Sequence, residues 1–217
     1  MSLRSIRQPG SSNRKLPLDA LIMMGVGLLF GMGGKFLSQN PTAVPSWVTS
    51  YGIGEMFQGK EFWMIVLIIV DIQFKSMGRA AAGAFGYTGG LVLSYVVYRY
   101  VFHGLFTSQE ILFWLMMLVV APFAGALCWL SQGQGDEALW IGAFLIAVMF
   151  VWSVNMGAWY LHVNDWKGVM LTGVGAILMF RDTNQMARLI FLALLMSVAV
   201  RDFGLPLWQT LANTIYH

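Results

Sequence analysis

A single carboxylate in the middle of a long apolar run is the residue of this chain best placed to do chemistry. Asp71 lies within the run Ile68-Ile69-Val70-Asp71-Ile72. An ionisable side chain in such a segment is costly to bury, and this cost indicates a functional role. Lys75 follows one helical turn later, so an acid–base pair at i,i+4 is the structural alternative. We therefore expect Asp71 either to pair within the fold or to contact a coupled ion or a substrate.

Asn155 and Ser153 form the second polar group, in the second half of an apolar helix predicted over residues 138–160. An amide and a hydroxyl at such positions can contact a substrate, and they can equally bond a neighbouring helix. The predicted substrate-binding set is therefore Asp71, Asn155 and Ser153, with hydrogen bonding between helices as the alternative.

The chain contains none of the residue patterns that support metal or covalent catalysis. The three histidines, His103, His162 and His217, have no metal-ligand spacing, and the single cysteine, Cys128, lies in another apolar run. No Gly-x-Ser-x-Gly motif marks a nucleophilic serine. We therefore expect no catalytic site, no metal and no cofactor.

The composition predicts a protein whose solvent is lipid. Hydrophobic residues make up 58% of the 217 residues, charged residues make up 11%, and the mean hydropathy is +0.67. Soluble domains have roughly 45–50% apolar and about 25% charged residues. The 13 Lys and Arg exceed the 10 Asp and Glu mainly because of the basic N-terminal tail. This excess indicates orientation and contact with anionic lipid, and no basic patch supports nucleic-acid binding.

Apolar runs recur along the whole chain and predict an all-α bundle of about seven transmembrane helices. A helix needs about 20 apolar residues to cross the hydrocarbon core, so the two shortest runs must bend or thin the bilayer locally. The predicted spans are residues 18–37, 61–75, 80–102, 111–130, 138–160, 166–180 and 186–200, in one transmembrane domain over residues 18–203.

Three polar segments are predicted to lie outside the hydrocarbon core. Residues 1–17 read as an uncleaved basic cytoplasmic tail, and residues 204–217 as a C-terminal tail at the interface. The connection over residues 38–60 contains Trp47 and Tyr51, which favour the boundary between lipid and water. We expect this connection to lie on the membrane surface or to cap the bundle.

Small residues and one proline are expected to control helix packing. Gly27 and Gly31 are one helical turn apart, and this spacing lets another helix approach closely. Pro122 lies near the middle of the predicted fourth span, where it removes one backbone hydrogen bond and favours a kink.

The distribution of basic residues predicts the orientation of the chain in the membrane. With the N-terminus in the cytoplasm, the inner connections hold eight of the 13 basic residues, among them Lys75, Arg79 and Arg181. Cytoplasmic loops carry the excess of Lys and Arg. We therefore expect the N-terminus inside and the C-terminus outside, in the plasma membrane of a bacterium.

Two similar segments within the chain suggest an internally duplicated architecture. Phe74-Lys75 and Phe180-Arg181 each end a short span and precede a short turn. The first three and last three spans would then be parallel repeats joined by an inverting fourth span. By architecture alone, this 3+1+3 plan is similar to that of the sugar transporters called SWEETs.

Several short segments also resemble an uncharacterised family of polytopic membrane proteins seen mainly in Gram-positive bacteria. The resemblance covers residues 62–187 and implies a membrane fold without implying an activity. The segments are Phe62-Trp63, Lys75-Ser76-Met77-Gly78-Arg79-Ala80-Ala81, Ser94-Tyr95, Ala121-Pro122-Phe123, Cys128-Trp129-Leu130, Gly133-Gln134-Gly135 and Phe180-Arg181.

Two hypotheses about function follow from the sequence. The first is a transporter of a small solute or ion, with a site between two three-helix units that uses Asp71 and Asn155. The second is a non-transporting subunit, immunity factor or assembly factor that contacts protein or lipid. Its partners would be the bilayer itself and either a second copy of the chain or another membrane protein.

Overall fold

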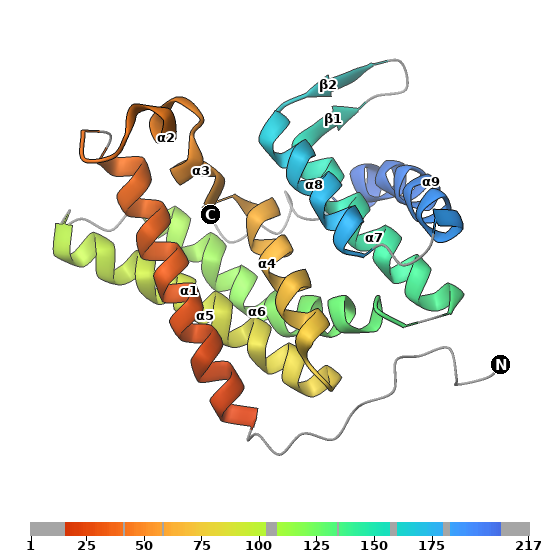
Figure 1. The fold of residues 1–217 in the computed structure, drawn as a ribbon, viewed down its shortest axis with the longest axis horizontal. Helices are drawn as coiled ribbons and strands as arrows, with labels where there is room; N and C mark the ends of the chain where they lie inside the picture. Colours follow the sequence, from red (N-terminus) through yellow and green to blue (C-terminus); the bar gives the residue numbers. More distant parts are fainter. Residues whose placement is uncertain are drawn as a thin grey trace. The chain divides into compact units, whose positions relative to one another are not determined.

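The computed structural model describes residues 16–40, 42–57, 59–102, 108–133, 135–156, 160–179 and 183–204. Most of them are helical, which confirms the all-α class (Figure 1). Residues 1–15 of the tail predicted over residues 1–17, and residues 205–217 of the tail predicted over residues 204–217, lie outside the described residues. The elements are α1 (Leu16–Gln39), α2 (Ser46–Ser50), α3 (Ile53–Phe57), α4 (Lys60–Gln73), α5 (Met77–Phe102), α6 (Ser108–Leu130), α7 (Asp136–Ser153), β1 (Val154–Met156), β2 (Leu161–Val163), α8 (Trp166–Leu178), α9 (Thr183–Ala199) and a π-helical turn (Val200–Gly204).

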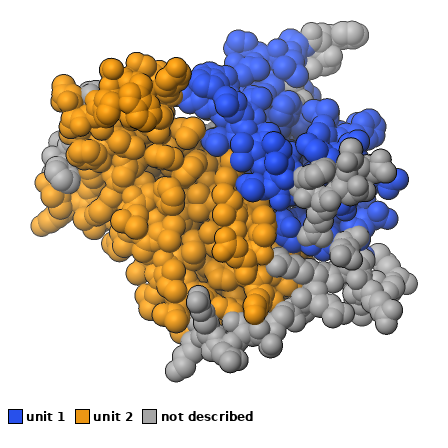
Figure 2. Space-filling model, in the orientation of Figure 1, with its two compact units in different colours: residues 1–6, 131–217 blue, residues 7–130 orange. Residues whose placement is uncertain are grey.

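The described residues form two compact units (Figure 2). The described residues from 16 to 130 form the N-terminal unit, and those from 131 to 204 form the C-terminal unit. The division follows α6, in the polar connection that begins at Ser131 and contains Gly133 and Gly135. Each unit is described by itself.

Helices α1 and α5 form the centre of the N-terminal unit and run in the same direction. A Cβ atom at Gly86 would overlap the carbonyl group of Ala20, and one at Gly31 would overlap the side chain of Ser94. Residue numbers therefore rise together along both helices. Glycines on each side of this contact let the two backbones approach closely.

Helices α4 and α6 run opposite to α5. In α4, Trp63 bonds to Thr88, while Phe74, just after the helix, lies against Gly83. In α6, the ring of Trp114 stacks on Tyr95, whereas a Cβ at Gly125 would lie 2.6 Å from the Cβ of Ala84. The helices α1, α4, α5 and α6 therefore alternate in direction along the chain.

The connection between α1 and α4 folds back onto α1. A Cβ at Gly54 would lie 2.8 Å from the backbone carbon of Leu37, so α3 approaches the end of α1 closely. The ring of Phe30 meets the rings of Phe57 and Phe62 edge to face, the Phe57 and Phe62 rings are tilted against each other, and the three centroids lie 4.9–6.0 Å apart. Three elements thus share one aromatic cluster. The turn between α2 and α3 uses Gly52 at φ 58°, a backbone conformation that favours glycine.

The C-terminal unit is built around α7, which packs against both α8 and α9. A Cβ at Gly142 would lie 3.2 Å from Leu189 of α9, and one at Gly175 would lie 3.3 Å from Met149 of α7. The Asp165 carboxylate accepts a hydrogen bond from the Lys167 N–H at 3.0 Å and so caps the start of α8.

The fifth predicted helix ends earlier than expected and is followed by a hairpin. Helix α7 stops at Ser153, and the two strands pair antiparallel with Asn155 opposite His162. The carbonyl of Ser153 accepts hydrogen bonds from the N–H groups of Asn164 and Asp165. Serine, asparagine and β-branched valine all lower helix propensity, and the prediction gave too little weight to them within an apolar run.

Three described helices are long and apolar enough to cross a membrane: α1, α5 through Val101, and α7. Trp114–Leu130 of α6 and Trp166–Leu178 of α8 are shorter apolar helices. Helix α4 has 14 residues, so it is shorter than an unbent span requires.

Candidate functional site

Asp71 occupies the buried face of α4. The carboxylate-bearing side chain is 0% exposed and follows Met64, Leu67 and Ile68 at helical spacing, all of them buried. These residues form one stripe toward the interior of the N-terminal unit. A charged carboxylate among apolar side chains is strongly disfavoured, so Asp71 must be neutralised by a proton, a cation or a positive neighbour.

The Cys128 thiol of α6 lies within electrostatic reach of Asp71. Cys128 is 1% exposed. Close to this pair, the indole N–H of Trp129 donates to the carbonyl of Phe74 at 3.0 Å, which joins the end of α4 to the end of α6. The candidate site is therefore the region between α4 and α6 where Asp71 and Cys128 come within electrostatic reach of each other, in the last turn of both helices.

Lys75 does not continue the helix that carries Asp71. Helix α4 ends at Gln73, and Phe74 is extended, so the predicted i,i+4 geometry is not formed. The Lys75 side chain is exposed, while Asp71 is fully buried. Helix α4 ends where its buried apolar stripe ends, because the exposed Lys75 side chain would not add to the packing of another helical turn.

Arg79 forms an ion pair with Asp19. Its guanidinium carbon also lies 5.9 Å from the centre of the Phe74 ring. Asp19 is only 3% exposed, so this pair is largely removed from solvent and fixes the beginning of α1 against the beginning of α5. The third basic residue of the predicted topology set, Arg181, lies outside the described residues.

Ser153 and Asn155 lie in the C-terminal unit and point to different environments. The Ser153 hydroxyl is buried and donates to the carbonyl of Met149 at 3.1 Å. Asn155 is exposed in β1. Two neighbouring residues at the end of a helix were expected to share one apolar environment, but the change from helix to strand separates them.

Gly27 and Gly31 both lie where α1 meets α5. A Cβ at Gly27 would overlap the carbonyl of Tyr87 and lie 3.0 Å from the Leu91 nitrogen. The face of α1 formed by Gly27 and Gly31, here called the glycine face, is thus covered by α5 within the N-terminal unit. Pro122 lies within α6, between the buried residues Ala121 and Ala124.

Two polar contacts in the N-terminal unit were not predicted. The indole N–H of Trp63 donates to the Thr88 hydroxyl at 2.9 Å, and that hydroxyl donates to the Ala84 carbonyl at 2.9 Å. The Lys35 ammonium lies 4.5 Å from the centre of the Tyr95 ring, which in turn stacks on Trp114. The aromatic residues could be read as an interfacial belt from sequence, but their partners depend on which helices meet.

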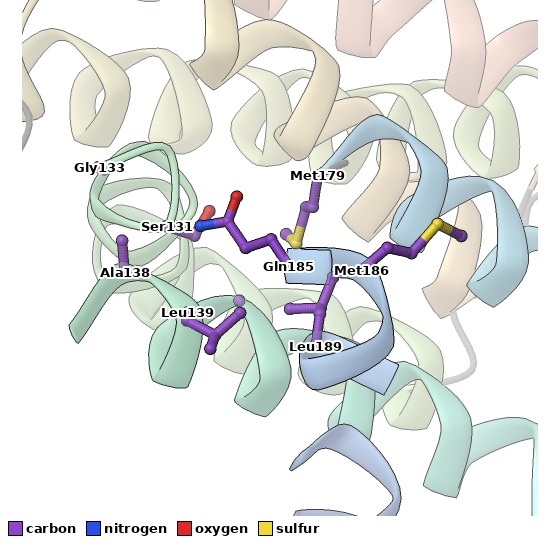
Figure 3. Close-up of a pocket in the computed structure, with 9 residues that line it drawn as sticks. Ser131, Gly133, Ala138, Leu139, Met179, Gln185, Met186 and Leu189 are labelled. Carbon is purple, nitrogen blue, oxygen red and sulfur yellow. The ribbon is translucent and has the colours of Figure 1, made fainter. Parts of the chain in front are cut away.

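A small cavity in the C-terminal unit lies apart from Ser153 and Asn155. Its volume is about 20 Å³, room for a single water molecule. Figure 3 shows the side chain of Gln185 extending toward Ser131 across this cavity. Ligand pockets have volumes of about 300–1,000 Å³, so this cavity does not qualify as a substrate site. Its lining consists of Ser131, Gly133, Ala138, Leu139, Gly142, Met179, Gln185, Met186 and Leu189.

Within the described residues, no group of three or more His, Cys, Asp or Glu side chains could hold a metal ion. The chain matches no model of a known protein family, no curated protein and no solved structure.

Proposed function

We propose that the protein is an integral membrane protein and that its seven predicted spans are the helices α1 and α4 to α9. Exposed large apolar side chains support this proposal, because both units have them, the N-terminal unit on α1 and the C-terminal unit on α9. They are Leu21, Ile22, Leu29 and Phe36 on α1, and Ile190, Phe191, Leu194 and Leu195 on α9. Such faces are unfavourable in water and are solvated by lipid acyl chains. The short helices α4 and α8 would cross with local thinning of the bilayer.

We further propose that the protein transports an ion or an ion-coupled small solute, and that Asp71 is the residue on which transport depends. The observation that carries this proposal is the complete burial of Asp71 on an apolar helix face. Ionisable residues within membrane spans mark ion and substrate pathways. The site then lies at the α4–α6 contact, and a role for Asn155 has no support from its exposed position in β1.

Ion flux into reconstituted vesicles tests the proposal. The native protein should dissipate an imposed proton or sodium gradient, and Asp71→Asn should abolish that flux because amide and acid have the same shape but only the acid exchanges an ion. Glu61→Gln is the matched control, since Glu61 is a buried carboxylate in the first turn of the same helix. Equal fluxes for native protein and Asp71→Asn, or none above empty vesicles for either, would refute a transport role for this site.

A non-transporting role in contacting a protein partner or lipid is the second candidate. It is favoured by exposed apolar side chains at the β-hairpin and the start of α8: Tyr160, Leu161, Val163 and Trp166. The glycine face cannot serve this role, because α5 already occupies it. Stoichiometric co-purification of a membrane protein that is lost in a Leu161→Asp/Val163→Asp variant, with no ion flux, would favour this function over transport.

A further inference from the structure

The ring of Phe74 occupies a notch in α5 at Gly83. A Cβ atom at Gly83 would lie 2.3 Å from Cε2 and 2.7 Å from Cζ of this ring, closer than non-bonded carbon atoms approach. At Gly27 and Gly86, by contrast, the atom nearest to an added Cβ is a backbone oxygen of the neighbouring helix. Gly83 therefore receives a side chain that can move, whereas the glycines between α1 and α5 receive a fixed backbone.

The notch is bordered by a cation that α1 holds in place. Arg79 lies one turn before Gly83 on α5, and its guanidinium carbon is 5.9 Å from the centre of the Phe74 ring, within the range of cation–π attraction. The same guanidinium pairs with Asp19 of α1. The seat of the Phe74 ring thus belongs to α1 and α5, which are joined by close glycine contacts.

The backbone of Phe74 is tied to a third helix. Its carbonyl accepts a hydrogen bond from the indole N–H of Trp129, a buried residue of α6, at 3.0 Å. Phe74 is extended and directly follows Gln73, the last residue of α4. One residue therefore fastens the end of α4 to α5 through its ring and to α6 through its carbonyl. Asp71 lies three residues earlier, on the buried face of α4.

We propose that Phe74 is a latch, a side chain that closes the region between α4 and α6 and keeps Asp71 from water on the side of the turn over residues 74–76. When the ring leaves Gly83, the last turn of α4 loses its hold on α5 and can move outward. The closure rests on the contacts of Phe74, whereas its part in a transport cycle rests on the proposed transport function.

The rate at which Cys128 reacts with N-ethylmaleimide measures this opening. Cys128 is the single cysteine of the chain, is 1% exposed and precedes Trp129 on α6, so the purified native protein in detergent should react slowly. Gly83→Ala should raise the rate about tenfold or more, since its methyl group displaces the ring by overpacking. Phe74→Ala should do the same, because it removes the ring. Gly78→Ala, in the first turn of α5, is the matched control and should react like the native protein, because nothing lies within 4 Å of a Cβ there.

A shorter side chain at position 74 should rescue the filled notch. The ring atoms that overlap the new methyl group are Cε2 and Cζ, which leucine lacks, whereas Cδ2 lies at an ordinary contact distance of 3.4 Å. Phe74→Leu/Gly83→Ala should therefore react more slowly than either single variant. If the effects of the two changes add instead, as they do at independent sites, the ring does not occupy this notch and the latch fails.

A second thiol separates local opening from unfolding of the whole unit. In a Cys128→Ala background, Ser94→Cys places a thiol at a fully buried position where α5 meets α1, and Phe74→Ala should leave its reaction rate unchanged. Equal acceleration at both positions, or a native rate at Cys128 in Phe74→Ala and Gly83→Ala, would overturn the latch even if the native protein conducts ions. Acceleration confined to Cys128, without ion flux by any variant, would refute the transport proposal and leave the latch in place.

Discussion

Four glycines of α1 differ in what surrounds them, although the sequence presents them as one glycine-rich run. At Gly27 and Gly31 an added Cβ would meet α5, whereas at Gly25 and Gly33 nothing lies within 4 Å. The spacing of Gly27 and Gly31 pointed to a helix contact. It could not indicate which helix would fill that contact, because five of the six other predicted spans also contain small residues.

Gly27→Ala should lower the free energy of unfolding by about 1–3 kcal/mol, as expected for overpacking. The new methyl group would force the Tyr87 backbone and therefore α5 away from α1. Gly25→Ala is the matched control, and it should be neutral or stabilise by up to about 1 kcal/mol through helix propensity. Thermal unfolding of both variants in the same detergent provides the measurement. Equal melting temperatures for the two variants would contradict the close α1–α5 contact.

The bond between Trp63 and Thr88 should depend on both partners. Thr88→Val leaves the buried indole N–H of Trp63 without its acceptor and should destabilise by about 1–3 kcal/mol. Adding Trp63→Phe removes the orphaned donor, so this double variant should lose less than the sum of the two single changes. Chemical denaturation of the four proteins completes the double-mutant cycle. A coupling energy near zero would argue against this contact between α4 and α5.

At the scale of elements, α1 and α5 are joined at both ends by polar contacts and between them by glycines. Asp19 pairs with Arg79 at one end, and the Asn40 amide donates to the Tyr98 hydroxyl at 3.3 Å at the other. Helix α4 has no comparable set of glycine contacts with α5. Any movement that exposes Asp71 is therefore expected to displace α4 relative to α1 and α5, which would move as one body.

Asp19→Asn should destabilise the protein strongly, because it leaves the largely buried guanidinium of Arg79 without its counterion. Removal of one partner of a buried pair costs about 3–5 kcal/mol. The double variant Asp19→Leu/Arg79→Met should recover much of that loss, since it removes both charges and keeps apolar volume. Unfolding in detergent measures all three proteins. If Arg79 were only an exposed topology signal, the double variant would be no more stable than Asp19→Asn, and this result would contradict a stabilising ion pair.

Helices were predictable from this sequence to a greater degree than their ends and partners. Residues 18–37 and 80–102 were predicted as spans and lie inside α1 and α5, because uninterrupted apolar runs leave the backbone few alternatives to helix. The hairpin after Ser153 was missed, since Val154, Asn155 and Met156 are too few to give a strand periodicity. The Asp19–Arg79 pair was missed because its partners are 60 residues apart.

At the scale of the whole molecule, the two units repeat one pattern of connection. In both units a short helix is followed, after a connection of three or four residues, by a longer helix: α4 and α5 in the N-terminal unit, α8 and α9 in the C-terminal unit. The units also differ, because α4 packs on α6 whereas α8 packs on α7. If the units arose by duplication, we therefore expect equivalent helices to keep the same direction across the membrane even where they pack against different neighbours.

This pattern predicts where each turn lies relative to the membrane. Single cysteines at Ser76 and Thr183, in a Cys128→Ala background, should both face the cytoplasm, and one at Ser50 between α1 and α4 should face outward. The reason is that the basic turns hold Lys75, Arg79 and Arg181, and cytoplasmic loops carry such an excess. In intact cells a membrane-impermeant maleimide should therefore label only the Ser50 position, and all three after permeabilisation. If Ser76 and Thr183 were labelled from opposite sides, α4 and α8 could not be equivalent members of parallel repeats, and the 3+1+3 plan would fail while the Asp71 site in the N-terminal unit would be unaffected.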